Sequence, residues 1–428
     1  MAEVDSGDTA WLLASAAFVF LMIPGLAFFY GGLVRHKNVL GTIMHSFVII
    51  ALVSVIWVLW GYSLAFGPDH GGFIGDFSWF GLRNVGGEPN PDYGATVPHQ
   101  AYMAFQMMFA IITPALITGA FAERAKFGTF LIFVVLWVTL VYAPVAHWVW
   151  AKDGWLGTNG GLGAYDFAGG TVVHINSGVA ALAAALVYGK RTGFGRAPME
   201  PHNIPFVVLG AGLLWFGWFG FNAGSAISSG ATAANAFVVT NTAAGAAALT
   251  WIGMSWLFQR APSVTGAAAG AVAGLVAITP ASGFVGAWEH GDGYLNIMPA
   301  ILIGLGAGFI CYLAARLRDR LDLDDALDVW AVHGVGGTWG AFATGLFATG
   351  AITTVTGFHG GIGGAIDGRP EQLLAQLAGI GATWGYSFVM TFGILKVLDW
   401  LMAVRVSPRE ELVGIDLAQH GERAYGSW

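Results

Sequence analysis

Two matching stretches, Asp166-Phe-Ala-Gly-Gly-Thr-Val-Val-His174 and Asp328-Val-Trp-Ala-Val-His333-Gly-Val-Gly-Gly337, each place a histidine shortly after an aspartate in a glycine-rich apolar segment. An ionisable side chain at bilayer depth is costly, so it normally faces an interior cavity and marks a transport path, a relay or a cofactor. One such histidine lies in each half of the chain. The pair therefore indicates the pore of a transporter or channel.

The composition is that of a polytopic membrane protein. The chain is 56% hydrophobic and 10% charged, with a mean hydropathy of +0.66, whereas a soluble domain carries about 25% charged residues. The single cysteine, Cys311, excludes an intrachain disulfide and a cysteine-based metal cluster. The sequence gives no indication of an enzyme, a cofactor, a metal site or a nucleic-acid partner, and membrane lipid is the expected surrounding.

Apolar segments long enough to cross a bilayer, about 20 residues each, recur along the chain and predict eleven transmembrane helices. The segments lie near 9–31, 43–66, 99–121, 128–150, 167–188, 203–225, 233–258, 263–282, 295–316, 329–350 and 373–403. Two of them, 263–282 and 329–350, are rich in Ala and Gly and are the weakest by hydropathy. The predicted fold class is an all-α integral membrane protein.

The positions of the 18 lysines and arginines predict the orientation in the membrane. Only Arg83, Lys152 and Arg369 fall on one side, and Lys396 lies within the last segment. The remainder fall on the other side, which identifies it as cytoplasmic. They are Arg35, Lys37, Arg124, Lys126, Lys190, Arg191, Arg196, Arg260, Arg316, Arg318, Arg320, Arg405, Arg409 and Arg423. The N-terminus is therefore expected outside and the C-terminus inside, which requires an odd number of spans.

An internal repeat follows from this count. The first ten helices divide into two five-helix halves, about 9–188 and 203–350, and an odd number per half makes the second half run inverted. Inverted repeats place the substrate path at their interface, and His174 and His333 lie in corresponding helices. We expect a membrane domain over 1–403, with the eleventh helix at about 373–403, and a cytoplasmic tail over 404–428.

Each candidate residue also has an ordinary structural interpretation. His174 and His333 could be hydrogen-bonded packing residues, or bis-histidine haem ligands, although a haem protein usually shows more such pairs. Asp166 and Asp328 could cap the helices that follow them, or place a carboxylate at the outer and inner mouths respectively. For Asp328 capping is the preferred interpretation. Glu123 and Arg124 resemble an interfacial ion pair.

Aromatic side chains usually belong to the core, but some could form a cation–π site at a pore mouth. Phe105 and Phe109 share one helix face. Phe221 lies in a Gly-Phe-Asn-Ala-Gly-Ser run, and Trp150 ends the fourth segment, where a place in the interfacial aromatic belt is the default.

Six strings, in order along the whole chain, together resemble the ammonium transporter family (Amt/Mep/Rh). The strings are Ile23-Pro-Gly-Leu-Ala-Phe-Phe-Tyr-Gly-Gly-Leu-Val-Arg35-His-Lys-Asn-Val39, Gly119-Ala-Phe-Ala-Glu-Arg124, Asp166-Phe-Ala-Gly-Gly-Thr-Val-Val-His-Ile-Asn176, Trp218-Phe-Gly-Phe-Asn-Ala-Gly-Ser225, Val332-His-Gly-Val-Gly-Gly337 and a tail with Gly414, Asp416, His420 and Gly421.

The resemblance implies roles for these positions. His174 and His333 are expected to be twin histidines that line the pore and bond to each other, below a gate formed by Phe109 and Phe221. An outer ammonium site is expected from Phe105, Phe109, Trp150 and Ser225, with Asp166 assisting recruitment and deprotonation. The expected product of that step, ammonia, then crosses the pore.

The resemblance also implies a homotrimer in the cytoplasmic membrane of the cell, with one pore per subunit. The tail residues Gly414, Asp416, His420 and Gly421 are expected to be regulatory and to lie near a docking surface for a PII-type signal protein. Two alternatives stay open at this point. They are a Rh-like neutral ammonia channel and an ammonium sensor that hardly transports.

Overall fold

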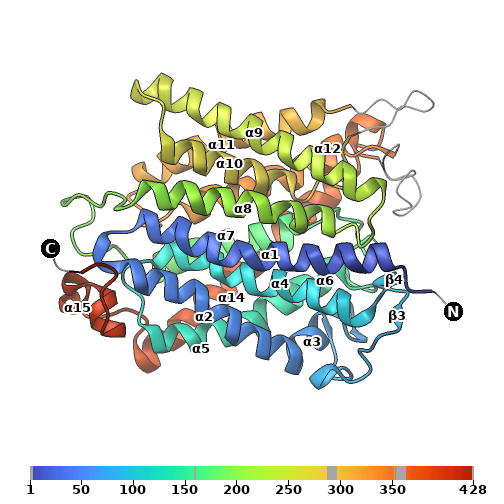
Figure 1. The fold of residues 1–428 in the computed structure, drawn as a ribbon, viewed down its shortest axis with the longest axis horizontal. Helices are drawn as coiled ribbons and strands as arrows, with labels where there is room; N and C mark the ends of the chain where they lie inside the picture. The colour runs from blue at the N-terminus through green and yellow to red at the C-terminus, as the bar shows by residue number, and fades with distance from the viewer. Residues whose placement is uncertain (1–2, 159–160, 287–295, 351, 353–362, 427–428) are drawn as a thin grey trace.

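The computed structural model describes residues 3–158, 161–286, 296–350, 352 and 363–426. Over these ranges the chain forms a bundle of helices that run side by side along its long axis (Figure 1). The N- and C-termini lie at opposite ends of the bundle. This placement agrees with an odd number of membrane crossings.

The long helices alternate with short helical turns and connectors. The helices are α1 (Ser6–Leu33), α2 (Val39–Ile56), α3 (Tyr62–Phe66), α4 (His99–Ile117), α5 (Phe127–Trp137), α6 (Ala143–Trp150), α7 (Asn176–Tyr188), α8 (Ile204–Gly224), α9 (Ala231–Gln259), α10 (Val264–Ile278), α11 (Met298–Arg320), α12 (Gly336–Phe347), α14 (Gln372–Met402) and α15 (Pro408–Val413).

Within the described ranges, nine helices are long and apolar enough to cross a membrane. The predicted segments 263–282 and 329–350 are represented by shorter helices, α10 and α12. Pro280 follows the end of α10 closely, and proline supplies no N–H to extend a helix. The all-helical multi-pass fold is confirmed, while the count of eleven spans and their inverted repeat stay predictions.

Several helices are joined end to end by π-helical turns. One such turn (Trp57–Gly61) joins α2 to α3, and another (Val138–Tyr142) joins α5 to α6. Two more open the helices that carry the histidines: Gly170–Ile175 precedes α7, and Trp330–Val335 precedes α12. π-Helical turns are rare and occur frequently at functional sites.

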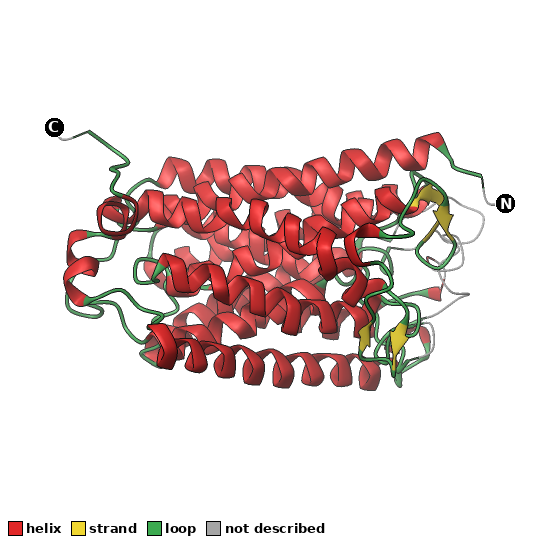
Figure 2. Cartoon of the chain, turned by 90° about the horizontal axis from the view of Figure 1, so that it is seen from below, coloured by secondary structure: helices red, strands yellow, loops and turns green. Residues whose placement is uncertain are grey.

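Two small hairpins lie at the end of the bundle where the N-terminus is, called the outer end below (Figure 2). Strands β1 (Asp69–His70) and β2 (Ile74–Gly75) form the first hairpin. Strands β3 (Pro89–Asn90) and β4 (Gly94–Pro98) form the second, with a register shift at Pro89/Asn90. The second hairpin is tied to the start of α1, because the N–H of Asp5 donates to the carbonyl of Thr96 at 2.8 Å.

Large apolar side chains remain exposed on the sides of the bundle. Trp400 is 84% exposed, Leu257 72% and Leu249 71%. Such side chains recur along α9, α11 and α14, and a water-soluble protein rarely exposes this much apolar surface. The apolar surface and the long helices together make this a multi-pass membrane protein.

Candidate functional site

The two histidines meet at the centre of the bundle. The Nδ1 atoms of His174 and His333 lie 3.2 Å apart, and the ring centroids are 5.3 Å apart with an angle of 28° between the planes. Both side chains are buried. His174 lies in the π-helical turn that opens α7, and His333 in the one that opens α12.

Glycines allow the two helices to come this close. A Cβ atom at Gly178 would overlap the backbone of Gly334. One at Gly337 would lie 3.0 Å from the amide nitrogen of Ile175 and 3.1 Å from the Cβ of His174. The Gly-Val-Gly-Gly run after His333 is therefore a packing requirement, since any side chain at these contacts would push the imidazoles apart.

A constriction of aromatic rings lies between the histidines and the outer end. The ring centroids of Phe109 and Phe221 are 4.3 Å apart, and Phe221 stacks on His174 at 5.9 Å with an angle of 22°. Trp218 stacks on the same imidazole at 5.2 Å. A space lined by Trp218, Phe221 and both histidines, but not by Phe109, has a volume of about 10 Å³, about the smallest volume that admits one water molecule.

A cavity of about 420 Å³ opens on the outer side of this constriction. Trp150, Asp166 and Ser225 line it, together with Tyr102 and Gln106. The Trp150 ring stands perpendicular to Phe109, with centroids 5.7 Å apart. The structure thus brings three of the expected outer residues together at one cavity, next to the Phe109 ring.

Phe105 is placed differently from the other outer candidates. Its side chain is fully buried, it packs against Phe109 with centroids 4.9 Å apart, and it is not among the residues that line the outer cavity. Tyr102 and Gln106 were not predicted, although each lies three residues before a predicted residue of α4, Phe105 and Phe109 respectively, and so shares its helix face. That spacing was the available signal.

Four backbone N–H groups donate hydrogen bonds to the carboxylate of Asp166. Oδ1 accepts from Gly169 and Gly170 at 2.8 and 2.6 Å, and Oδ2 accepts from Thr171 and Val172 at 2.8 and 3.1 Å. The carbonyl of Asp166 accepts from the Trp150 indole N–H at 2.9 Å. One residue therefore caps the His174 helix and fixes the tryptophan ring.

Ser225 keeps its acceptor capacity free. Its hydroxyl donates to the carbonyl of Phe221 at 2.8 Å, so its only hydrogen is used and the oxygen lone pairs are left for a donor in the cavity.

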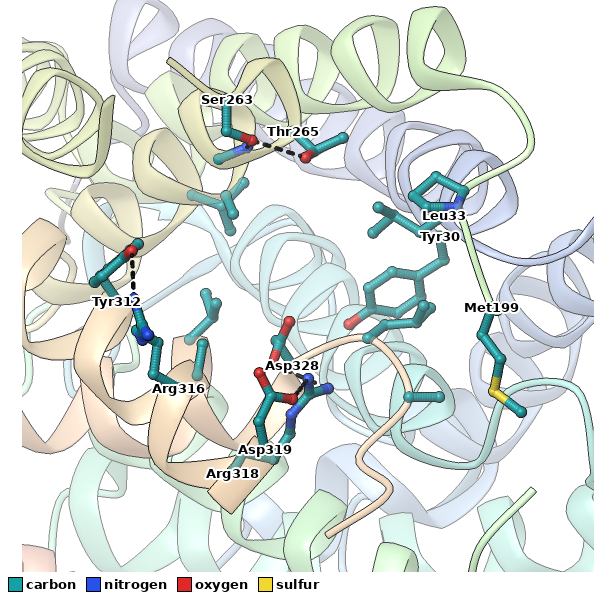
Figure 3. Close-up of a pocket in the computed structure, with 18 of the residues that line it drawn as sticks. Tyr30, Leu33, Met199, Ser263, Thr265, Tyr312, Arg316, Arg318, Asp319 and Asp328 are labelled. Carbon is teal, nitrogen blue, oxygen red and sulfur yellow. Dashed lines mark hydrogen bonds and ion pairs between the residues drawn. The ribbon is translucent and has the colours of Figure 1, made fainter. Parts of the chain in front are cut away.

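A second cavity, of about 470 Å³, lies on the inner side of the histidines. His333 borders both this inner cavity and the small space at the constriction. Figure 3 shows the phenol of Tyr30 in the wall of the inner cavity, together with Arg318 and its ion-pair partners Asp319 and Asp328. The outer cavity, the aromatic rings, the two imidazoles and the inner cavity therefore follow one another through the molecule.

The prediction that Asp328 caps the helix of His333 is wrong. Asp328 has a left-handed backbone (φ 59°) and pairs with Arg318 at 3.2 Å. The cap comes from Asp325, whose Oδ2 accepts from the N–H of Trp330 at 2.7 Å. Burial, reinforced by the charge of Asp328, raises the pKa of Asp325 to about 6. The Leu-Asp-Asp-Ala-Leu-Asp run offered several aspartates, and their order alone did not identify the cap.

Glu123 and Arg124 do not pair with each other, so that prediction is also wrong. Glu123 binds Arg35 at 2.6 Å and Arg191 at 3.2 Å, and Arg191 also binds Asp324 at 2.8 Å. Burial alone would raise the pKa of Glu123, but the hydrogen bond from Arg35 and the charge of Arg191 hold it below its usual value.

Arg124 is fully buried, and its guanidinium donates to backbone carbonyls, including that of Asp324 at 2.6 Å. These buried charges join the inner loops of both predicted halves, because Glu123 belongs to the first half and Asp324 to the second.

The tail folds back on the inner ends of the helices. Asp416 accepts from the N–H of Gly41 at 2.8 Å, in the first turn of α2. His420 packs its ring edge on Phe127 with centroids 5.0 Å apart. Gly414 and Gly421 have φ of 105° and 69°, a backbone conformation that glycine adopts without steric cost. These four residues thus form a docked segment.

Among the residues that the structure describes, no group of three or more His, Cys, Asp or Glu side chains is arranged to hold a metal ion. The side chains of the site can supply hydrogen bonds, cation–π contact and proton transfer.

Comparisons with known proteins agree with this arrangement. Residues 10–425 match the model of the Ammonium Transporter Family. An ammonium transporter of Bacillus subtilis is 49% identical, over 99% of both chains. The crystal structure of Candida albicans Mep2 superposes with a TM-score of 0.88 at 39% identity, over 98% of this chain and 90% of that one. A structure titled Sensor Amt Protein gives a TM-score of 0.85 at 29% identity, over 97% and 98%. The chain belongs to the ammonium transporter family.

Proposed function

We propose that this protein carries ammonium across the cytoplasmic membrane by binding the cation in the outer cavity, removing its proton there and passing ammonia through the constriction. The observation that carries the proposal is the space of about 10 Å³ that Trp218, Phe221 and the two histidines line together with apolar side chains. It admits one molecule of the size of water or ammonia and leaves no room for a hydration shell.

The constriction supplies the selectivity. Ammonium and potassium have the same charge and similar size, so a polar pore of fixed radius would pass both. An apolar passage imposes a large desolvation cost on an intact cation. Ammonium escapes that cost by giving up a proton, and potassium cannot.

The outer cavity suits a small cation with N–H groups. The ring of Trp150 offers a π face for a cation, and the Ser225 oxygen has free lone pairs for an N–H donor. The Asp166 carboxylate is occupied by backbone N–H groups. Asp166 therefore supports the recruitment of ammonium through its charge and through its hydrogen bond to Trp150. It assists deprotonation of ammonium, although other oxygens in the cavity have fewer hydrogen-bond partners.

The histidine pair suits both ammonia and its proton. One proton between the two Nδ1 atoms makes one imidazole the donor and the other the acceptor. The donor ring then has a bare Nε2 and the acceptor ring a protonated Nε2. The pair thus offers ammonia one acceptor and one donor, and a shift of protons between the rings relays a charge.

Two other functions, a neutral ammonia channel and an ammonium sensor, can be distinguished from this one by measurement. A Rh-like neutral channel would pass ammonia without current. The likeness to a sensor protein supports a sensor with little transport as the second candidate. The docked tail supports regulation by a cytoplasmic partner of the PII type, and a homotrimer is the expected assembly.

The test is a current measurement on purified protein in liposomes adsorbed to a solid-supported membrane, with ammonium and potassium pulses. We expect an ammonium current and no potassium current. Internal alkalinisation without current would favour the neutral channel. Neither signal, from protein that binds ammonium, would favour the sensor.

A further inference from the structure

His147 is a fully buried histidine on α6, and it has no role in the transport path proposed above. Its Nδ1 lies 2.9 Å from the backbone carbonyl of Ala65, and its Nε2 lies 2.8 Å from Oδ1 of Asp69. A carbonyl oxygen can only accept, so Nδ1 must carry a hydrogen. An ionised carboxylate also only accepts, so Nε2 must carry one as well.

Asp69 is held in its ionised form by its own neighbours. The N–H of Gly72 donates to both carboxylate oxygens, at 2.7 and 2.9 Å. Burial alone would raise the pKa of Asp69, but the hydrogen bonds from His147 and Gly72 outweigh it and hold the pKa below its ordinary value. With Asp69 ionised, the geometry requires a doubly protonated imidazole at His147.

We propose that His147 and Asp69 form a proton-binding site at the outer end of the protein, in which a buried imidazolium is paired with the carboxylate. Asp69 is 21% exposed and His147 is not exposed at all. A cavity of about 240 Å³ borders both residues. It shares Asp92, Tyr93 and Ala151 with the outer cavity of the transport path, so the site exchanges protons with the same solution that supplies ammonium.

The bound proton has a structural consequence for the transport path. His147 lies one helical turn before Trp150 on α6. The hairpin of β1 and β2 is fastened across this helix end by the Asp69–His147 pair and by a bond from the Trp148 indole to the Phe73 carbonyl at 2.8 Å. A neutral ring can donate to only one of its two acceptors, Asp69 or the Ala65 carbonyl, so loss of the proton removes one of these bonds and loosens the end of α6 that holds Trp150.

Other charged or titratable groups surround the pair and contribute to its field. They are His70 on the same hairpin, Asp92 and Tyr93 between β3 and β4, and Lys152 and Asp153 after α6. Lys152 binds Asp92 at 3.0 Å. None of these five donates to or accepts from the imidazole among the bonds of the described chain. Asp69 is therefore the group that sets the protonation of His147.

The first experiment reads the proton directly. Nitrogen-15 NMR of histidine-labelled protein distinguishes an imidazolium from either neutral tautomer. Because both ring nitrogens face acceptors, we expect both nitrogens of His147 to carry a hydrogen at about neutral pH. In Asp69→Asn the amide N–H can donate to Nε2, so the same ring should become the neutral tautomer that keeps only the Nδ1 hydrogen. A neutral His147 ring in the wild type would overturn the proposal.

The second experiment rests on the proposed function and reads its consequence. We expect the wild-type KM for ammonium to rise at low external pH, where Asp69 takes up a proton and the pair loses its charge-assisted hydrogen bond. Asp69→Asn should flatten this dependence, because its contact needs no titrating proton. Asp69→Ala should raise the KM about tenfold, the worth of one charge-assisted hydrogen bond.

The control is Asp153→Asn, which changes a carboxylate of the same cavity that does not touch His147. It should keep the wild-type pH dependence. An Asp69→Asn protein that kept that dependence would overturn the positional role. If the wild type gave no ammonium current at all, the proposed function would fail, while the nitrogen signals would still decide the proton-binding site.

Discussion

Asp325 stands to His333 as Asp166 stands to His174. Each aspartate uses Oδ2 to accept the N–H of the residue five positions further on, Trp330 and Thr171 respectively, at 2.7 and 2.8 Å. In both cases the capped segment is a π-helical turn that contains the histidine. The two carboxylates therefore orient the two imidazoles from matching places in the chain.

Removing either cap should loosen the histidine that follows it. For Asp325→Ala and Asp166→Ala we expect the free energy of unfolding to fall by about 1–3 kcal/mol, because buried N–H groups lose their acceptor. Thermal unfolding in detergent, followed by tryptophan fluorescence, measures this. Asp322→Asn is the control, since Asp322 is exposed, its carboxylate pairs with Lys190, and Asn tolerates its left-handed backbone (φ 55°). Equal effects at all three positions would contradict the capping role.

Replacing both imidazoles with apolar side chains should show whether the ammonium current depends on a proton relay through His174 and His333. In His174→Leu with His333→Leu we expect the ammonium current to fall at least about tenfold, the usual order for loss of a proton-transfer group. Trp218→Phe leaves both imidazoles in place and serves as the comparison. A double variant with unchanged ammonium current and unchanged exclusion of potassium would refute the relay.

The glycine contact between α7 and the turn before α12 should tolerate no side chain. Gly178→Ala places a methyl group against the backbone of Gly334. We expect a loss of about 1–3 kcal/mol in stability from this overpacking, together with a reduced current. Gly245→Ala on α9 is the matched control, because a Cβ there meets nothing within 4 Å. Should the two variants behave alike, the close approach would not matter.

The buried carboxylate of Glu123 should make stability fall in acid. Its pKa is depressed, because the Arg35 hydrogen bond and the Arg191 charge outweigh burial. Its contribution is therefore present above the unfolded pKa of about 4.3 and is lost as pH falls through the lower folded value. Glu123→Gln should cost about 1.5–3 kcal/mol at neutral pH, because Arg35 and Arg191 lose a charged acceptor, and it should lose less stability than wild type on acidification.

Acid unfolding at fixed temperature measures that difference. Glu371→Gln provides the comparison, because the pair of Glu371 with Arg369 is exposed and worth little. If the stability of Glu123→Gln fell with pH in the same way as that of the wild type, the role given to Glu123 would be contradicted.

The tail should detach when its capping carboxylate is removed. Asp416→Ala deprives the first turn of α2 of its acceptor for the Gly41 N–H. We expect hydrogen exchange over residues 404–426 to quicken by about one order of magnitude, in line with loss of a cap worth about 1 kcal/mol. Arg409→Ala, at the exposed start of α15, should leave the exchange unchanged. Protection that survived Asp416→Ala would show that other contacts hold the tail.

The fold was predictable because hydropathy and charge placement act along the chain. The long apolar segments became long helices, and the two Ala/Gly-rich segments became the short ones, α10 and α12. The meeting of His174 and His333 could be expected only from the resemblance, since residues 159 positions apart have no periodic signal in common. The described structure leaves the roles given to the gate and pore residues as predictions.

Residues paired across the sequence escaped prediction for a similar reason. Asp69 lies 78 positions from His147, and neither residue stands in a motif. Asp325 is one of several neighbouring aspartates, and only the backbone structure shows that it is the one that caps the helix of His333. Glu123 and Arg124 are adjacent in sequence, and adjacency suggested a pair, yet the positive φ of Glu123 (73°) turns the chain at that residue.

The backbone contact between Gly178 and Gly334 limits the conformational changes that are open to this protein. Many secondary transporters expose their site alternately by rocking one repeat against the other. Here the two histidine-bearing segments touch main chain to main chain, and the buried charges around Glu123 tie the two halves at the inner end. A rocking motion would have to break both connections in each cycle. Under the proposed function we therefore expect passage to rely on small rotations of side chains such as Phe221, with turnover limited by ring movement and proton transfer rather than by reorientation of domains.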